Sequence, residues 1–361
     1  VAPAAPTRLV AKGLSAAVRL SWDANSEKDL RGYTVLRAEA AAGDADRQWF
    51  TIARDVKTCH YVDNACAPAR TYIYKVKAMD QSQNLSEASE TAQATVGGGK
   101  AMTAQWLFEG TLEDQTANQM DAAILGDTVF TSVCKEGLQA ISLNATRSLQ
   151  LPYEVADYDE MTFCAWVDWR SSGTWQRIFD FGNGTSQYMF LTPSNGSVMR
   201  FAIKDGGDEQ TVDCTAKLSL NTWKHVAVTI GNGKTTIYID GEEAASSNAV
   251  TIRPSDIHPV LNYLGRSQFV ADPWFVGYLD DVRIYNCALT ADEVRQAMEP
   301  MKKGDVNSDG QVDVADIAAV LNLMAGTAGD TIATAADVNG DGQVDVADIA
   351  SILSIMAGVG Q

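Results

Sequence analysis

The sequence has few basic residues, few histidines and no long apolar run. Its 361 residues carry 46 acidic and 28 basic side chains, a formal net charge of −18, so nucleic-acid phosphates and anionic membrane surfaces would repel the chain. No apolar stretch reaches the roughly 20 residues of a membrane-spanning helix, which argues against membrane insertion. The histidines, His60, His225 and His258, are far apart, and no serine or cysteine motif surrounds them. The residue inventory therefore predicts no nucleic-acid partner and no nucleophile–histidine pair.

Cysteines are also sparse and lack the spacing of a zinc site. None forms a CxxC pair. They are either buried small hydrophobic residues or up to three disulfides of an oxidising compartment, and the six are Cys59, Cys66, Cys134, Cys164, Cys214 and Cys287. Cys59 and Cys66 form the only local pair. The opening residues VAPAAPTRLV have neither the basic nor the apolar region of a signal peptide, so we expect a mature product or an excised piece of a secreted protein.

A motif present twice carries the strongest chemical signal. Residues 305–318 read DVNSDGQVDVADIA and residues 337–350 read DVNGDGQVDVADIA. In each, oxygen-bearing side chains stand at positions 1, 3, 5, 9 and 12, glycine stands at position 6, and position 7 offers its backbone carbonyl, as in calcium loops. Oxygen ligands without His or Cys select a hard cation, and we predict two calcium sites. The first has the ligands Asp305, Asn307, Asp309, Gln311, Asp313 and Asp316, and the second Asp337, Asn339, Asp341, Gln343, Asp345 and Asp348. The alternative, a solvated acidic loop, would have to repeat the same offsets by accident.

Helical spacing follows each loop. The apolar residues recur at i, i+3, i+4 and i+7, which predicts two short helices that bury their stripes against each other. These stripes are Ile317, Val320, Leu321 and Met324 in the first helix and Ile349, Ile352, Leu353 and Met356 in the second. The tandem of half-hands over residues 302–361 resembles a type I dockerin, a calcium-dependent module that joins secreted polysaccharide-degrading enzymes to cohesin partners. The resemblance places partner recognition at Val314, Ala315, Val346 and Ala347. Because this pair is apolar, the partner is either a cohesin-like protein or the neighbouring domain of the same chain.

The N-terminal part has the alternation of a half-buried β-sheet. AVRLSW places Val18, Leu20 and Trp22 on one face, and TYIYKVKAMD alternates in the same way. GYTVLRA adds a further strand with the same alternation. With the proline-led start, residues 1–97 resemble a fibronectin type III β-sandwich. Such a domain is a ligand-adhesion module or a rigid spacer. The chain contains no Arg-Gly-Asp triplet, and we favour a spacer.

After the glycines at 97–99, residues 101–298 show strand and turn patterns with almost no helical periodicity. Hairpin turns are predicted at residues 231–233 and at Asp240–Gly241. MTFCAWVDW, NTWKHVAVTIGNGKTTIYIDGEEA and GYLDDVRIYNCALT make this part resemble a laminin-G-like, concanavalin A-like jelly roll. The fold class is therefore mostly β and multidomain: a fibronectin III β-sandwich, a jelly-roll β-sandwich and a small α-helical calcium-binding dockerin.

The jelly roll lacks a clear catalytic constellation. The nearest acidic cluster, Asp157, Asp159 and Glu160, cannot readily provide an acid and a base, because consecutive strand residues point to opposite faces. His225 lies in a strand motif and is predicted to be structural. Relatives of this fold often hold one structural calcium near the ends of the domain, and the matching acids are Glu109, Asp114 and Asp281. Ordinary hydrogen-bonded turn acids are the alternative.

Sugar binding is a better guess than hydrolysis. Apolar sugar faces stack on flat aromatic rings, and polar groups take the hydroxyls. Candidate carbohydrate-binding residues are Trp169 and Trp175, which flank RSSGT, and Trp274. Each is alternatively a core residue, and Trp166 and Trp223 are predicted to be core.

The order of the three modules resembles the C-terminal accessory region of an extracellular, or cell-surface, glycoside hydrolase-type protein. We therefore expect a non-catalytic region whose jelly roll binds a polysaccharide or glycan and whose dockerin binds two calcium ions and a protein. A third calcium ion belongs to the jelly roll if its acids converge. One alternative is a structural tail without glycan binding, and another is a glycosidase activity in the jelly roll.

Overall fold

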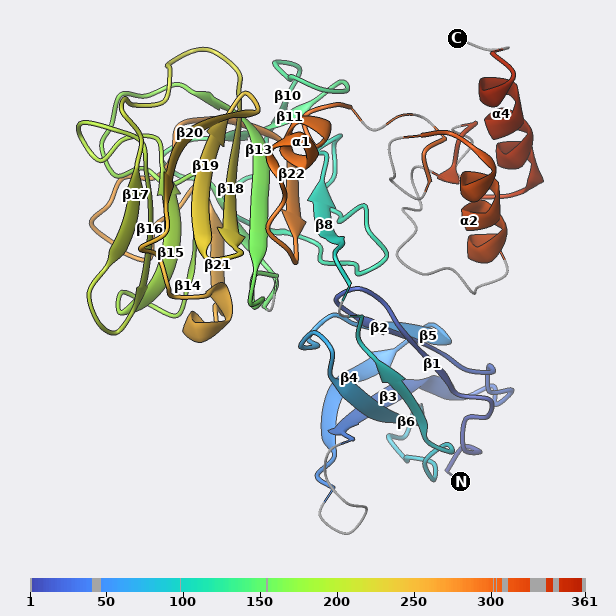
Figure 1. The fold of residues 1–361 in the computed structure, drawn as a ribbon. Coiled ribbons are helices and arrows are strands. Elements are labelled where there is room, and N and C mark those ends of the chain that lie inside the picture. The colour runs from blue at the N-terminus through green and yellow to red at the C-terminus, as the bar shows by residue number, and fades with distance from the viewer. Residues whose placement is uncertain are drawn as a thin grey trace. The chain divides into compact units, whose positions relative to one another are not determined.

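The computed structural model describes residues 2–40, 47–97, 99–153, 155–300, 302, 304–306, 311–324, 336–339 and 344–358. The chain divides into two compact units, Val1–Gly99 and Lys100–Gln361. Regular structure in these ranges is mostly β-sheet with a few short helices, which confirms the predicted fold class (Figure 1). Across the same ranges, every helix is too short or too polar to cross a membrane.

The first unit contains two antiparallel sheets. One has three strands in the order β1-β2-β5, and the other has four in the order β4-β3-β6-β7. The first sheet consists of β1 (Val10–Gly13), β2 (Val18–Ser21) and β5 (His60–Asp63). The second consists of β4 (Phe50–Val56), β3 (Leu30–Glu39), β6 (Thr71–Asp80) and β7 (Ala92–Thr95).

The alternating residues of the first unit form one shared core. Val18, Leu20 and Trp22 are buried together with the inward residues of β3 and β6, as the alternation predicted. The Trp22 ring meets the Tyr33 ring edge to face, with 5.2 Å between centroids. Arg37 belongs to the same inward series, and it is tolerated because its Nη1 donates to Asp63 at 2.9 Å.

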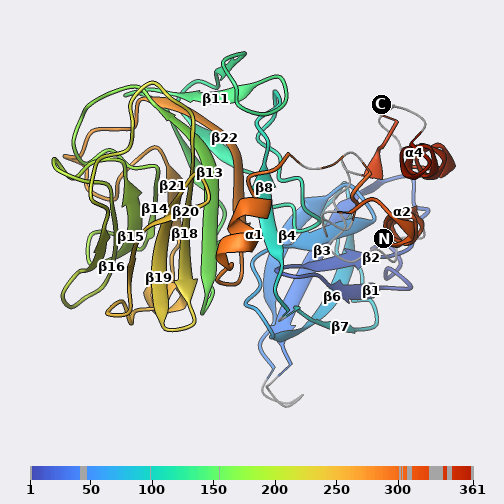
Figure 2. The ribbon, with the colours of Figure 1, turned by 45° about the horizontal axis from the view of Figure 1, so that its top comes forward.

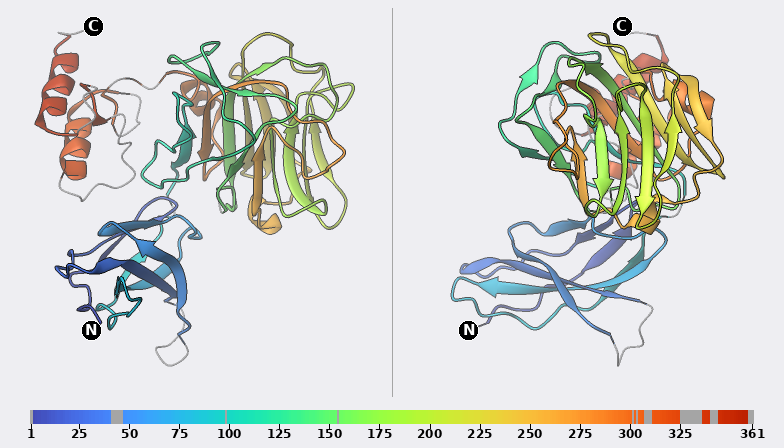
Figure 3. Two further views of the ribbon diagram at one scale, coloured as in Figure 1. Left: turned by 180° about the vertical axis from the view of Figure 1, so that it is seen from behind. Right: turned by 90° about the vertical axis from the view of Figure 1, so that its left-hand side faces the viewer.

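The second unit contains two larger sheets that form separate layers (Figures 1 and 2). The eight-stranded sheet runs β10-β11-β22-β13-β18-β19-β20, with β8 also paired to β22. Its strands are β8 (Met102–Trp106), β10 (Phe130–Thr131), β11 (Ala140–Leu143), β13 (Met161–Trp169), β18 (Lys224–Gly231), β19 (Lys234–Ile239), β20 (Glu242–Ser247) and β22 (Gly277–Tyr285). The seven-stranded sheet runs β17-β16-β15-β14-β21-β12-β9 (Figure 3). Its strands are β9 (Ala123–Leu125), β12 (Ser148–Leu151), β14 (Phe179–Gly182), β15 (Gln187–Thr192), β16 (Arg200–Asp205), β17 (Gln210–Asp213) and β21 (Leu261–Leu264).

Aromatic packing joins the two layers. Phe163 of β13 lies 4.5 Å from Phe179 and 6.3 Å from Phe181 of β14, measured between ring centroids. Residues that alternate with these three face outward from the layers, and this outward series includes Asp180 and Trp166. The outer faces of both sheets are therefore the places where polar and aromatic groups gather.

Both predicted hairpin turns are confirmed. Gly231 pairs with Lys234, so Asn232 and Gly233 form a two-residue turn with φ of 54° and 70°. Asp240 and Gly241 connect β19 to β20 with φ of 51° and 78°. Positive φ at both turn residues matches the twist of antiparallel strands, which explains the Asn-Gly and Asp-Gly sequences.

A short helix covers part of the outer face of the eight-stranded sheet. Helix α1 (Ala291–Gln296) begins at Thr290, whose side chain accepts from the Glu293 backbone, and a 3-10 turn η1 spans Pro254–Ile257. Val294 of α1 packs into a buried cluster with Cys164 and Cys287. All six cysteines are free thiols, Cys59 and Cys66 included, and four of them are buried.

The C-terminal segment contributes helices α2 (Val314–Met324) and α4 (Val346–Met356), which contact each other. Val320 and Ile352 are buried between them, and Ile317 and Ile349 are partly buried. The predicted stripes are only half right, because the remaining members are 40–51% exposed: Leu321, Met324, Leu353 and Met356. The buried stripe instead continues through Leu323 and Ile355, which lie one turn further along the same face.

Candidate functional site

The last ligand position of each predicted calcium loop is a fully buried carboxylate. Asp316 accepts hydrogen bonds from the Val306 and Asp313 backbone amides, both at 2.7 Å. Asp348 accepts from the Asn339 and Asp345 amides at 3.0 and 2.8 Å. Both side chains are 0% exposed. Each carboxylate therefore ties the start of its loop to the first turn of the following helix.

The same acids also cap the helices. Asp345 begins α4, its side chain accepts from the Ala347 amide, and Asp348 completes a capping box. Asp313 makes the equivalent bond to the Ala315 amide at 2.7 Å. Loop positions 9 and 12 thus serve the loop and the helix together, a signal that the D-x-x-D spacing of both repeats already contained.

Charge balance in this segment favours a bound cation. Residues 302–361 contain nine acids, two lysines and no arginine. Asp305, Asp316 and Asp348 are buried, and a buried carboxylate is costly without a compensating charge. Each carboxylate oxygen has two lone pairs, so an amide and a cation can share it. Oxygen-only donors thus fit calcium, although Asn307, Asp309, Asp341 and Gln343 lie outside the described residues.

The two helices each expose an apolar face. Val314 is 70% exposed and Val346, at the same place in the second repeat, is 68% exposed. Ala315 and Ala347 are exposed beside them, and Leu321 and Leu353 continue each face along its helix. The predicted partner-recognition residues therefore lie on two matching apolar surfaces.

In the jelly roll, Gln176 connects the three candidate tryptophans. Its Oε1 accepts from Trp169 Nε1 at 2.7 Å, and its Nε2 donates to the Trp274 backbone carbonyl at 2.9 Å. Trp175 precedes Gln176 in the chain. Trp169 is only 1% exposed, so the prediction that it stacks on a sugar is wrong: its ring fills the core and its N–H is used internally. Trp175 and Trp274 are half-buried and keep part of their surface in solvent.

Trp175 belongs to an aromatic patch on the outer face of the seven-stranded sheet. We define this patch as Trp175, Tyr188, Phe190, Tyr263, Phe269 and Trp274. Tyr188 stacks on Phe190 at 5.7 Å, and the rings of Trp175 and Phe269 meet this pair edge to face. The Arg266 guanidinium connects the remaining two members, because its Cζ lies 5.0 Å from the Tyr263 ring centre and 5.2 Å from that of Trp274.

Buried ion pairs hold the loops of this patch in place. Arg177 is 2% exposed and donates to Asp180 of β14 at 3.2 Å and to Asp272 of the loop after β21 at 2.8 Å. Its Nη1 also donates to the Trp175 carbonyl at 2.6 Å. Trp175 adopts φ of 62°, a left-handed conformation that is strained for a bulky residue. The Arg177 contact and the bond from the Trp175 amide to the Ser194 carbonyl at 2.8 Å support that conformation.

The acids predicted for a third calcium ion do not form an open site. Asp281 forms a buried ion pair with Arg283 and also accepts from Gln105 Nε2 at 2.8 Å. Asp114 accepts from the Gln105, Thr116 and Met120 amides, each at 2.9 Å. Glu109 instead accepts from the Leu138 amide. Because Arg283 already supplies the positive charge beside Asp281, the geometry favours the alternative of hydrogen-bonded turn acids.

The acidic cluster considered for catalysis is likewise engaged in structural contacts. Asp157 lies 3.7 Å from His258, and Asp159 accepts from Arg253 at 3.1 Å. Glu160 accepts from the Asn232 amide. Trp166 is 8% exposed and His225 1%, as predicted for core and structural residues, whereas Trp223 is only half-buried.

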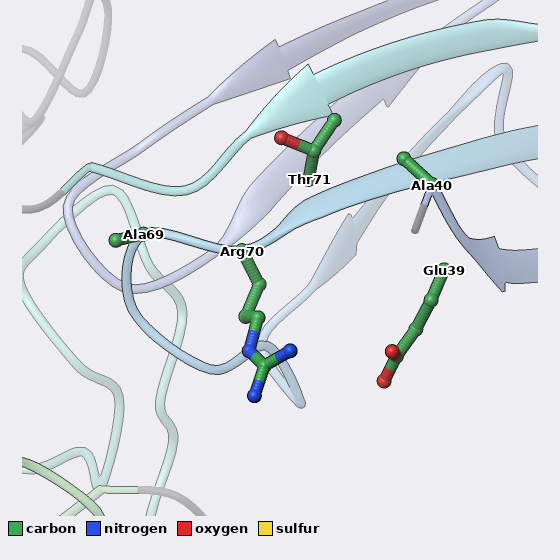
Figure 4. Close-up of a pocket in the computed structure, with 5 residues that line it drawn as sticks. All are labelled: Glu39, Ala40, Ala69, Arg70 and Thr71. Carbon is green, nitrogen blue, oxygen red and sulfur yellow. The ribbon is translucent and has the colours of Figure 1, made fainter. Parts of the chain in front are cut away.

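The first unit has a separate shallow pocket of about 300 Å³ (Figure 4). It is lined by Glu39, Ala40, Ala69, Arg70 and Thr71. The Glu39 and Arg70 side chains extend on opposite sides of it. This lining offers one acid and one base but no aromatic ring, so it differs in kind from the aromatic patch.

Comparison with known families agrees with this architecture. Residues 143–295 match the family model of the concanavalin A-like lectin/glucanases superfamily, and residues 303–354 match that of the dockerin type I domain. The dockerin match implies calcium binding and a cohesin-type protein partner. Together the two matches support a non-catalytic accessory role in a carbohydrate-active protein. A comparison with curated proteins finds no similar sequence.

Solved structures share the fold. Domain 4 of AbnA, a GH43 extracellular arabinanase from Geobacillus stearothermophilus solved with arabinotriose, is 22% identical, with a TM-score of 0.50, covering 55% of this chain and 99% of that one. An Fn3-like protein from Clostridium thermocellum is 26% identical, with a TM-score of 0.23, covering 27% and 98%. The CBM40 of Ruminococcus gnavus IT-sialidase, bound to α2,3 sialyllactose, is 23% identical, with a TM-score of 0.36, covering 39% and 83%.

The buried acid of the aromatic patch predicts a pH dependence of stability. Burial raises the pKa of Asp180 to about 7, against the opposing effect of Arg177, so the folded jelly roll binds more protons than the unfolded chain at neutral pH. The free energy of unfolding should therefore rise by somewhat under about 1 kcal/mol as pH falls from about 8 to about 6.5. Burial lowers the pKa of His225 to about 4, which opposes this trend only below that window. Guanidinium unfolding followed by tryptophan fluorescence at constant calcium measures the slope. Asp180→Asn should flatten it, and a stability that increases toward pH 8 would contradict the assignment.

Proposed function

We propose that this chain is a non-catalytic accessory region of an extracellular carbohydrate-active enzyme, in which the jelly roll binds a glycan and the dockerin segment binds calcium and a protein. We assign three domains: a fibronectin type III-like spacer over residues 1–97, the jelly roll over 101–298 and the dockerin over 302–361. The observation that carries the glycan assignment is the aromatic patch. It combines half-buried rings with fixed polar groups on the outer face of one sheet.

Trp274 and Trp175 are the residues we propose for stacking on sugar rings. Both rings are partly solvent-exposed, and both are fixed through the backbone by Gln176 and Arg177. A ring held rigidly before binding loses little conformational entropy when the sugar arrives, so the arrangement favours binding over a purely structural tail.

For the dockerin segment we propose two calcium ions, one per repeat. Position 12 of each loop has the same buried, amide-bonded carboxylate, and the oxygen ligands repeat at the same offsets. The protein partner would rest on the paired apolar faces around Val314 and Val346. Because such exposed apolar surface is unfavourable in water, a cohesin-type protein is the partner we favour over the neighbouring domain. The dockerin match likewise supports an extracellular location.

A glycosidase activity of the jelly roll is the weaker candidate. Asp157, Asp159 and Glu160 bond to three different loops, and each contact is one that stabilises a turn or an ion pair. Hydrolysis of a polysaccharide by this chain, abolished by Glu160→Gln, would support it.

Replacing Trp274 with Ala should weaken glycan binding about 10-fold or more, because the stacking surface is lost. A glycan array that includes arabino-oligosaccharides, the ligand type of the AbnA domain, identifies the glycan, and calorimetry measures its affinity. Trp223→Ala is the matched control, since Trp223 is also half-buried but packs on Tyr278 of the other sheet. Equal loss in both variants, or no bound glycan, would contradict the proposed site.

Removing calcium should unfold the C-terminal helices. Each loop carries four carboxylates, and two like charges about 4 Å apart repel by up to roughly 4 kcal/mol at an effective dielectric near 20. Circular dichroism should show helix loss on addition of a chelator and recovery with calcium, and calorimetry should give two ions per chain. Asp348→Ala should abolish one ion only. Unchanged helix content without calcium would rule out the metal assignment.

The double substitution Val314→Asp and Val346→Asp should reduce binding to a panel of cohesin modules by at least about 100-fold, because two charges would have to be buried in the interface. Surface plasmon resonance with the full chain measures this. Leu138→Asp, which places the same charge on an apolar residue 79% exposed in the jelly roll, should have no effect. Undiminished binding by the double variant would exclude these faces.

A further inference from the structure

Arg266 differs from most arginines of the jelly roll in having no anionic partner. It follows β21 and is half-buried, with its guanidinium between the rings of Tyr263 and Trp274. Within the described ranges it forms neither an ion pair nor a hydrogen bond, and the ring contacts account for its interactions. Its N–H donors are therefore held in a fixed plane and left for another molecule.

Arg147 stands at the same end of the sheet. It immediately precedes β12, and Leu149 of β12 pairs with Leu264 of β21 in antiparallel register. Arg147 and Arg266 therefore flank the same end of this strand pair. Arg147 also forms no ion pair with a residue that the structure describes, and its Nε is buried without a hydrogen-bond partner.

The nearby acids do not neutralise these two arginines. Asp272, in the loop that Arg266 begins, accepts from Arg177 and from the Ser267 hydroxyl. Asp127 follows Gly126, which lies against Arg147, and makes no ion pair among the described residues. Elsewhere in the jelly roll arginines are paired with carboxylates, namely Arg170, Arg177, Arg200, Arg253, Arg283 and Arg295. Two uncompensated cations at one place are notable in a chain of net charge −18.

We propose that this end of the β12–β21 pair binds the carboxylate of an acidic sugar, with the Trp274 ring beneath the sugar face. This inference rests on the proposed glycan binding and narrows its ligand class to carboxylate-bearing glycans. The planar guanidinium donors of Arg266 match the two oxygens of a carboxylate, and aromatic contacts on both sides keep that plane fixed. Arg147 supplies the second positive charge.

The test compares acids with their own neutral forms. Oligosaccharides of galacturonate, glucuronate and N-acetylneuraminate are each prepared as the free acid and as the methyl ester, which keeps the sugar and removes the charge. Calorimetry with the full chain in calcium should show at least one acid bound about 10-fold or more tightly than its ester. Raising the salt concentration should weaken binding of the acid but not of the ester.

Two variants and a control locate the charge. Arg266→Gln and Arg147→Gln should each weaken binding of the acid about 10-fold or more, to the level of the ester. Arg147 has no ring contact among the described residues, so its effect cannot come from displacing Trp274. Arg170→Gln is the matched control: Arg170 also lies over a tyrosine ring, 5.0 Å from the centre of Tyr278, but is paired with Asp168. It should leave binding unchanged.

The outcomes separate this inference from the proposed function. Equal affinity for acids and esters, binding of neutral glycans alone, or preference for sulfated over carboxylated sugars would overturn the carboxylate site while leaving glycan binding intact. No binding to any sugar would overturn both. If Arg266→Gln fails to fold, unchanged affinity in Arg147→Gln overturns the inference.

Discussion

The ion pairs of Arg177 with Asp180 and Asp272 are the interaction on which the candidate glycan site depends. They join a strand of the seven-stranded sheet to the loop that carries Phe269 and leads to Trp274. The same guanidinium lies 3.8 Å from the centre of the Phe190 ring and bonds to the Trp175 backbone. Loss of one partner of a buried ion pair typically costs about 3–5 kcal/mol, because the remaining charge is left uncompensated. The aromatic rings are thus positioned by a buried charge cluster rather than by apolar packing alone.

A comparable economy operates in the C-terminal segment, where one set of acids serves the loop and the helix. Asp313 and Asp345 cap α2 and α4, and Asp316 and Asp348 bind backbone amides of the preceding loop. A helix of eleven residues is marginal alone, so its stability depends on the cap, on the opposing helix and on the charge state of the loop. Metal binding and helix formation are consequently one equilibrium in this segment.

Much of the fold could be predicted because its signals are local. Alternating residues such as Val18, Leu20 and Trp22, the Asn232–Gly233 turn and the repeated acidic loops each identify their structure within a few residues. The glycan site could not be predicted in the same way. Gln176 and Trp274 are 98 positions apart, and Arg177 and Asp272 are 95 apart, so only the folded sheet brings them together. Trp169 was misassigned because periodicity does not reveal which face of β13 meets the other sheet. The exposed Leu321 and Met324 show the same limit, since a helix with apolar residues on two faces does not disclose which face is covered.

The thiols beneath α1 give the jelly roll a built-in reporter of its own opening. Cys164 has no exposed surface, and burial raises its pKa to about 12. Alkylating reagents attack the thiolate, so Cys164 is inert while α1 rests on the sheet and becomes reactive once the helix detaches. The rate of its modification therefore reports the free energy of local detachment separately from global denaturation. One end of the sandwich can in this way be followed without an introduced label.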